Sequence, residues 1–291
     1  PPPPPLFSSR RRHTRCGWLS RGLGDVYKRQ MARCPVLFVS HGMPNIALNP
    51  GRIGAFWQQL GRELERPRAI ICISAHLEAT RPLVTTDPYP ETIHDFSGFP
   101  RALYDIRYPA HGEPDLAQHV VTRLQQAGYD AAPLENRGLD HGVWVPLRSM
   151  VPQADVPVIQ LSLQTTEPPA YHVALGQALA PLRDLGVLII GSGGATHDLS
   201  GMAGNPMDTA PAEYAAAFDQ WLADTVATGD IELLVDYRRQ APHADRNHPY
   251  PAEHFLPLLV AAGAAAETPA GIGLFRQFVY GVLSLAAYRW E

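Results

Sequence analysis

Cysteine is scarce in this chain, and long hydrophobic runs are missing. The three cysteines, Cys16, Cys34 and Cys72, are too few and too scattered to predict a disulfide framework or a cysteine-based zinc site. No apolar run approaches the roughly 18 residues that a membrane-spanning helix needs, which disfavours a membrane protein. Because paired cysteines are missing, a reducing compartment fits, and we expect a cytoplasmic protein.

Charge is distributed unevenly along the 291 residues. Residues 1–30 hold seven Lys or Arg and a single acidic residue, whereas residues 31–291 hold 17 basic and 27 acidic residues. An acidic body disfavours a nucleic-acid partner. The basic segment has the composition of an RNA-binding arm or a transit peptide, but it opens on five prolines and has no amphipathic period.

Residues 1–30 are better explained as sequence that is not native. They contain SSRRRHTRCGW and VYKRQ, which resemble translated sequencing-adapter read-through. We therefore expect a non-native or disordered tail over residues 1–30, a native start at Met31, and one catalytic domain over residues 31–291. That length is sufficient for a single α/β domain with a well-buried core.

Short β-branched runs alternate with helical patterns after Met31. The runs that predict buried strands are Val36–Ser40, Ala69–Ser74, Pro157–Leu163 and Gly186–Ile190. The stretches that predict helices are Ile53–Arg66, Asp115–Ala127, Ala170–Leu185 and Pro211–Ala227. Apolar strands separated by helices indicate an α/β fold in which helices flank a mostly parallel central sheet. In such sheets, ligands bind beyond the carboxyl ends of the strands.

Histidine follows three of these four predicted strands. His41 comes directly after the first, His76 two residues after the second, and His197 after a glycine-rich turn that follows the fourth. Parallel strands end at one edge of a sheet, so we expect these side chains to meet there. Imidazoles suit zinc, iron or copper better than magnesium or calcium. The residues alone thus indicate a metal site built mainly of histidine, and both hydrolytic and oxidative chemistry remain open.

Other histidines are weaker candidates. His254 and Glu253 are expected in the first turn of a helix, where a capping and packing role is the plain alternative. His141 follows Asp140, a carboxylate that could orient its ring, although Asp-His-Gly is also a simple turn. His94 is the least specific. The remaining histidines that we interpret as structural or surface residues include His13, His119 and His172.

Six segments of the chain together resemble the class III extradiol ring-cleaving dioxygenases, most closely the 4,5-DOPA dioxygenase-like branch. They are SHGMPN (Ser40–Asn45), SAHLE (Ser74–Glu78), TIHDFSGFPRALYDIRYPA (Thr92–Ala110), GLDHGVW (Gly138–Trp144), GSGGATHDL (Gly191–Leu199) and HPYPAEHFLPLL (His248–Leu259). Each is weak singly, but six in the right order are specific. One departure is Leu77, because the branch usually has a Trp after this histidine.

The resemblance implies a metal site and two acid/base residues. It implies a non-haem Fe(II) site, open also to Zn(II), with the ligands His41, His76 and His254. His197 is implied as a second-sphere acid/base that can also approach the metal. His141 is implied to contact the substrate or to relay protons. A related branch uses a Glu as its third ligand, so Glu253 remains an alternative to His254.

The implied reaction opens a catechol ring with dioxygen, next to the diol, to give a muconic semialdehyde. We expect a DOPA-like or other 3,4-dihydroxyphenyl substrate, bound by a loop that offers His94, Phe99 and Tyr104. On the same loop, Arg101 and Arg107 either bind a substrate carboxylate or face solvent. Two alternatives are a zinc-dependent hydrolase and a non-enzymatic Memo-like metal-binding or redox signalling protein.

Overall fold

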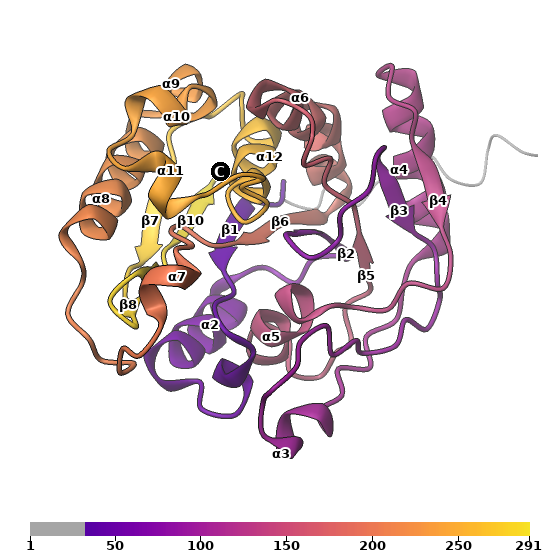
Figure 1. Cartoon of the computed structure of the whole chain (residues 1–291). Coiled ribbons are helices and arrows are strands. Elements are labelled where there is room, and N and C mark those ends of the chain that lie inside the picture. The colour runs from indigo at the N-terminus through magenta and orange to yellow at the C-terminus, as the bar shows by residue number, and fades with distance from the viewer. Residues whose placement is uncertain (1–32) are drawn as a thin grey trace, which may run out of the picture. The chain divides into compact units, whose positions relative to one another are not determined.

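A six-stranded sheet forms the centre of the computed structural model, which describes residues 33–291 (Figure 1). The predicted tail over residues 1–30 lies outside the described residues. The strand order is β5-β2-β6-β1-β10-β7. These strands are β1 (Val36–Ser40), β2 (Ala69–Ser74), β5 (Val158–Gln160), β6 (Val187–Gly193), β7 (Ile272–Phe275) and β10 (Ala287–Trp290). The pairs β1–β6, β2–β6 and β2–β5 are parallel, which confirms the prediction of a mostly parallel sheet in a single α/β domain.

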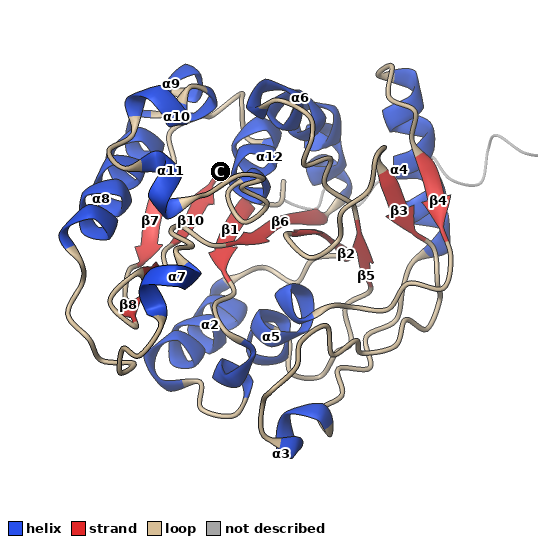
Figure 2. Cartoon of the chain, viewed as in Figure 1, coloured by secondary structure: helices blue, strands red, loops and turns tan. Residues whose placement is uncertain are grey.

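Helices cover both faces of this sheet (Figure 2). One apolar cluster joins one face to α4, α6, α8 and α12, and a second joins the other face to α2 and α5. Those helices are α2 (Gly51–Glu63), α4 (Pro114–Gln126), α5 (His141–Met150), α6 (Pro169–Leu179), α8 (Glu213–Thr228) and α12 (Leu256–Ala264). Alternate residues of β1 divide between the two clusters, as the two-residue period of a strand requires.

Shorter elements complete the described part of the chain. The remaining strands are β3 (Leu83–Thr85), β4 (Ala132–Leu134), β8 (Phe278–Val279) and β9 (Leu283–Ser284). The remaining helices are α3 (Arg101–Tyr104), α7 (Leu199–Met202), α9 (Ile231–Val235), α10 (Tyr237–Gln240), α11 (Ala244–Asn247) and the 3-10 segments η1 (Pro44–Ala47) and η2 (Ala180–Leu185). Within residues 33–291, no helix is long and apolar enough to cross a membrane.

The register of the central strands brings three strand ends level. Ser40 pairs with Gly193 across β1 and β6, and Ser74 pairs with Ser192 across β2 and β6. The residues that follow these three strands therefore leave the sheet at the same edge. This is the edge at which open α/β sheets bind ligands.

The sequence interpretation of His254 was wrong in one respect. The residue lies in a turn before α12, which begins only at Leu256. Pro257 occupies the first turn of that helix, where a missing backbone N–H and a fixed φ are tolerated. The helix therefore begins beside this proline, and Glu253 and His254 remain in the preceding turn.

Candidate metal centre and active site

Three histidines from distant parts of the chain converge at the edge of the sheet. His41 follows β1, His76 follows β2, and His254 precedes α12; one nitrogen of each lies within 4.8 Å of the others. The Nε2 atoms of His41 and His76 are 3.1 Å apart. Two nitrogens bound to one metal ion at about 2.1 Å each lie roughly 3 Å apart when their bonds are nearly perpendicular. This spacing therefore fits two ligands of one ion.

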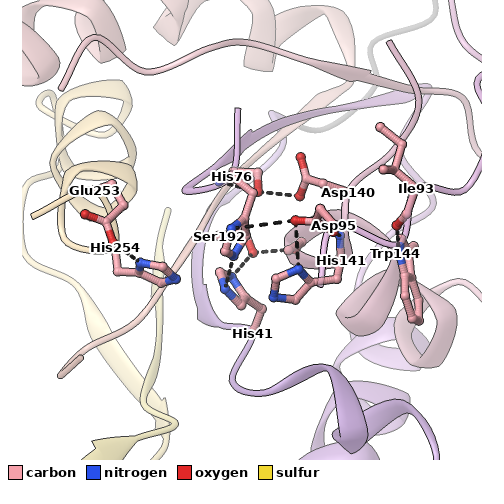
Figure 3. A network of polar contacts seen from close by, with 12 residues as sticks. His41, His76, Ile93, Asp95, Asp140, His141, Trp144, Ser192, Glu253 and His254 are labelled. Carbon is pink, nitrogen blue, oxygen red and sulfur yellow. Dashed lines mark hydrogen bonds and ion pairs between the residues drawn. The ribbon is translucent and has the colours of Figure 1, made fainter. Parts of the chain in front are cut away.

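The hydrogen bonds of His41 leave its Nε2 free for a metal. Ser192 Oγ lies 3.0 Å from His41 Nδ1, and the same hydroxyl donates its proton to the carbonyl oxygen of Gly142. Since its single proton is committed there, Ser192 accepts from His41 Nδ1–H. The lone pair of the neutral ring is then on Nε2, which faces the other histidines (Figure 3). Metal-binding histidines characteristically have a second-shell partner of this kind.

The other two histidines also have oxygen atoms beside Nδ1. His254 Nδ1 lies 2.8 Å from Glu253 Oε1, so the carboxylate sits on the side of the ring away from Nε2. His76 Nδ1 is 3.7 Å from Asp95 Oδ2, and its backbone N–H donates to Ser74 Oγ. Because Glu253 engages the imidazole, it acts here as the partner of His254.

Burial keeps the three converging rings neutral. Burial, followed by the repulsion of neighbouring histidines, lowers the pKa of His41 and of His254 well below the ordinary value. The pKa of His76 falls to about 3, again chiefly through burial. Neutral imidazole is the form that binds a metal ion. The donor set thus fits a transition-metal ion such as iron or zinc.

His141 is held by one carboxylate through two hydrogen bonds. Its backbone N–H donates to Asp95 Oδ1 and its Nδ1–H to Asp95 Oδ2, each at 2.9 Å. Burial opposes the ionisation of Asp95, but these hydrogen bonds and the nearby histidine charges outweigh it and lower its pKa to about 2. An ionised Asp95 fixes the proton on Nδ1, so Nε2 carries the lone pair. The ring lies against His76, with centroids 4.0 Å apart.

His197, which the resemblance implies is an acid/base residue that can also approach the metal, lies against His254. Its ring stacks on that of His254, with centroids 3.4 Å apart and planes 12° apart. It groups with Glu253 and His254 rather than with the nitrogen atoms of His41 and His76. Its Nδ1 is 3.9 Å from Glu253 Oε1, beyond hydrogen-bonding distance. Burial lowers the pKa of His197, and Glu253 partly opposes this effect.

Phe96 contacts both His141 and the predicted substrate residues. Its ring meets that of His141 edge to face, with centroids 5.7 Å apart. Phe99 and Tyr104 pack behind it at 5.3 Å, and His94 packs at 5.7 Å with Nε2 bonded to the carbonyl of Ile106. The structure therefore brings His94, Phe99 and Tyr104 together as an aromatic group behind Phe96.

The two loop arginines show no contact with the histidine cluster. Arg107 donates to the carbonyl oxygens of Tyr104 and Ile106 and lines a surface hollow with Tyr89 and His111. Arg101 is exposed at the start of α3. A different cavity, of about 240 Å³, does border the cluster, and its lining includes His197, His254, Glu253, Asp198, Ser200 and Tyr250.

Several residues of the site were not singled out from the sequence. Asp95 lies in one of the recognised segments, but only the folded loop places it against His141. Asp140, which was proposed to orient His141, is instead fully buried and accepts a hydrogen bond from Ser74 Oγ. Ser192 lies near the end of β6, and its role depends on its contacts with His41 and Gly142. Alternating Gly and Ser at the end of a buried strand was the available signal.

Comparison with known proteins gives consistent results. The family described as "Catalytic LigB subunit of aromatic ring-opening dioxygenase" matches residues 54–281. A "4,5-DOPA dioxygenase extradiol" from Beta vulgaris is 42% identical over 257 residues, which cover 87% of this chain and 95% of that protein. Another of that name, from Escherichia coli K12, is 40% identical and covers 80% and 85% respectively. The crystal structure of the uncharacterized E. coli K12 protein JW3007 aligns with a TM-score of 0.74 at 32% identity, over 89% of this chain and 100% of that one.

Proposed function

This chain belongs to the LigB family of aromatic ring-opening dioxygenases, and from that premise we propose that it opens a catechol ring by extradiol cleavage at one ferrous ion. The observation that carries the proposal is the convergence of three neutral imidazoles whose Nδ1 atoms face oxygen atoms. Such a set leaves coordination positions open for substrates, and its lack of charge favours an anionic catecholate. The proposed ligands are His41, His76 and His254, and Zn(II) would compete for them.

Ferrous iron would supply the activation of both the catechol and dioxygen; the protein supplies orientation and proton transfer. His141 is the proposed base. Asp95 holds its proton on Nδ1, and the ring points toward His41 and His254 (Figure 3). Nε2 is then available to accept the proton that a catechol hydroxyl loses on binding. In this role Asp95 acts by fixing the tautomer and the direction of the ring.

His197 is the proposed acid. It has no fixed hydrogen-bond partner on either ring nitrogen among the described residues, so it can take up a proton and turn to deliver it. Imidazole suits this task because its intrinsic pKa lies near neutrality, although burial lowers it here. Glu253 beside it favours the protonated form and partly offsets the burial.

A catechol with a short side chain is the proposed substrate, such as DOPA or another 3,4-dihydroxyphenyl compound. The cavity of about 240 Å³ beside His197 and His254 has room for such a side chain. Glu253 on its wall favours an ammonium group over a second carboxylate, whereas the charge of Asp198 is already paired with Arg246. The ammonium of DOPA would therefore lie in this cavity, and its carboxylate toward solvent.

The test is anaerobic reconstitution with Fe(II), followed by oxygen-electrode assays over a panel of catechols. We expect oxygen uptake and a ring-opened semialdehyde, identified by mass and absorbance. DOPA and dopamine should be used with lower KM than 3,4-dihydroxyphenylpropionate, which lacks the ammonium. A cis,cis-muconate product, no oxygen uptake with any catechol, or anaerobic turnover with Zn(II) would contradict the proposal.

A further inference from the structure

A second, much smaller cavity borders the histidine cluster. Its volume is about 20 Å³, and it shares His41, His197 and His254 with the cluster. The opposite walls come from the turn after β1 and from the C-terminal segment around β9. They are formed by the backbone of Gly42, Gly193 and Gly194 and by the side chains of Met43, Leu283 and Leu285. We refer to this cavity as the glycine niche; Figure 3 shows two of its walls, His41 and His254.

Two hydroxyl groups beside the glycine niche donate their protons to backbone carbonyl oxygens and so offer no proton to a guest. Ser40 Oγ donates to Ala286 O and accepts from the backbone N–H of Ala195. Thr196 Oγ1 donates to Val282 O and accepts from the N–H of Ser284. A buried water usually needs two to four polar partners, and cavities without them stay dry. Apart from the histidine rings, the surface that lines the niche is mostly apolar, so the niche favours a small apolar guest.

Glycine is required for the niche to exist. A Cβ on Gly193 would lie 2.1 Å from the carbonyl oxygen of His254, so no other residue allows the end of β6 to approach the His254 turn this closely. Gly42 has a φ of +64°, and its Cβ would lie 2.8 Å from a methyl carbon of Leu285. These two positions set the spacing between the histidines and the C-terminal segment.

We propose that the glycine niche is a holding site for dioxygen beside the metal ligands, an inference that rests on the proposed function. Its size excludes the aromatic substrate, since cavities that hold benzene are on the order of 150 Å³, whereas a water-sized molecule needs about 10–15 Å³. Dioxygen is small, uncharged and weakly solvated, which matches the apolar wall and the satisfied hydroxyls. The catechol would then approach from the side of His141 and the larger cavity, so the two substrates do not compete for space.

Xenon and oxygen kinetics test this proposal in the Fe(II)-loaded enzyme. Crystals pressurised with xenon should show density in the niche. Leu285→Phe, which fills it, should remove that density and raise KM for O₂ about tenfold, the scale of a lost apolar contact, with the KM for catechol unchanged. Leu285→Ala, which enlarges it, should raise xenon occupancy. Val282→Ala, a truncation in the same segment outside the niche lining, is the control and should behave like the wild type.

The possible failures are distinguishable. A wild-type enzyme that turns over catechols but shows no xenon density, or a Leu285→Phe variant with unchanged KM for O₂, overturns the niche alone. If Leu285→Phe does not fold, unchanged xenon occupancy in Leu285→Ala has the same consequence. Equal increases in both KM values would make Leu285 a general packing residue and also overturn the inference. Lack of oxygen uptake by the wild type with every catechol contradicts the proposed function instead.

Discussion

His141 and His197 stand beside the same three histidines but are held in contrasting ways. His141 makes two hydrogen bonds of 2.9 Å to Asp95, one from its backbone and one from its ring. His197 is 3.9 Å from the carboxylate of Glu253 and is held by stacking on His254. A ring with a fixed tautomer suits a proton acceptor that faces one direction, whereas a ring without a fixed partner can change its protonation and orientation. The difference supports the proposed roles of His141 as the base and His197 as the acid.

The largest expected effect is the loss of bound metal, which should distinguish the three proposed ligands from His141 and His197. His41→Ala, His76→Ala and His254→Ala should each abolish metal binding and turnover, because each removes a bond to the ion. His197→Ala and His141→Ala should retain most of the metal and lower turnover by roughly 10²–10⁴-fold. Metal analysis and oxygen uptake on all five proteins are the measurements. Loss of metal in His197→Ala would show that His197 is a ligand. Retention of metal in His254→Ala, together with its loss in Glu253→Gln, would show that Glu253 is the third ligand instead of His254.

Substitutions of Asp95 and Glu253 test what each carboxylate does for the histidine that it contacts. Both carboxylate oxygens of Asp95 accept hydrogen bonds from His141, and Asp95→Asn replaces one of them with an NH₂ group that donates. The His141 ring can then be forced into the other tautomer. Turnover should fall about 10²-fold with metal retained. Glu253→Gln should instead weaken metal affinity by about 10–100-fold, because it changes the partner of a ligand. ¹⁵N shifts of the His141 ring would report the tautomer. An unchanged tautomer in a slow Asp95→Asn variant would contradict the role given to Asp95.

Acid should destabilise the protein through histidines outside the cluster as well. Burial, the largest cause, lowers the pKa of His172 to about 4 and that of His248 to about 3. Below pH 6.5 the unfolded chain binds protons that the folded chain does not, so stability falls as the pH drops from 6.5 toward 4. At pH 5 each such histidine should cost on the order of 2 kcal/mol. Urea unfolding of metal-free protein at pH 7 and pH 5 measures this, and His248→Gln should flatten the dependence.

The aromatic group near His141 should give a smaller effect. Phe96→Leu removes the ring that meets His141 edge to face, so it should raise the KM for catechol by a factor of about 5. Phe99→Leu, one layer further back, is the matched control and should change KM by a factor of less than about 2. Steady-state kinetics decide between them. Equal effects would show that the loop acts as one packing unit.

Removal of residues 1–30 should have the smallest effect. The segment lacks the periodic apolar residues needed to pack on a core, so a chain that starts at Met31 should fold and turn over like the full chain. Thermal unfolding and oxygen uptake of the two proteins are the comparison. Loss of folding or activity on truncation would show that the segment belongs to the protein.

The strand ends were predictable because local signals coincide there. The runs at β1, β2 and β6 are buried throughout and apolar except near their ends, and each is followed within a few residues by histidine. Helix α5 was not predicted, since Pro146 lies inside it and its start at Asp-His-Gly has the pattern of a turn. The C-terminal strands have only two to four residues, too few to show a period.

The contacts that distinguish the two flanking histidines could not be predicted from the sequence. Asp95 and His141 are 46 residues apart, and their pairing depends on the path of an irregular loop. Glu253 was weighed as a ligand because a related branch uses a Glu at that position, and the sequence does not show that this carboxylate contacts Nδ1 of His254. The positions of His41 and His76 follow from strand topology and the proposal of His254 from the resemblance, whereas the hydrogen bonds that set the tautomers follow only from the folded structure.

Anomalous diffraction at the iron edge, from crystals loaded anaerobically with Fe(II), tests the central claim most directly. We expect a single iron peak about 2.1 Å from the Nε2 atoms of His41, His76 and His254, with Asp95 and Glu253 still bonded to Nδ1 of His141 and His254. A peak bound to Glu253, or one between His76, Asp95 and His141, would contradict it.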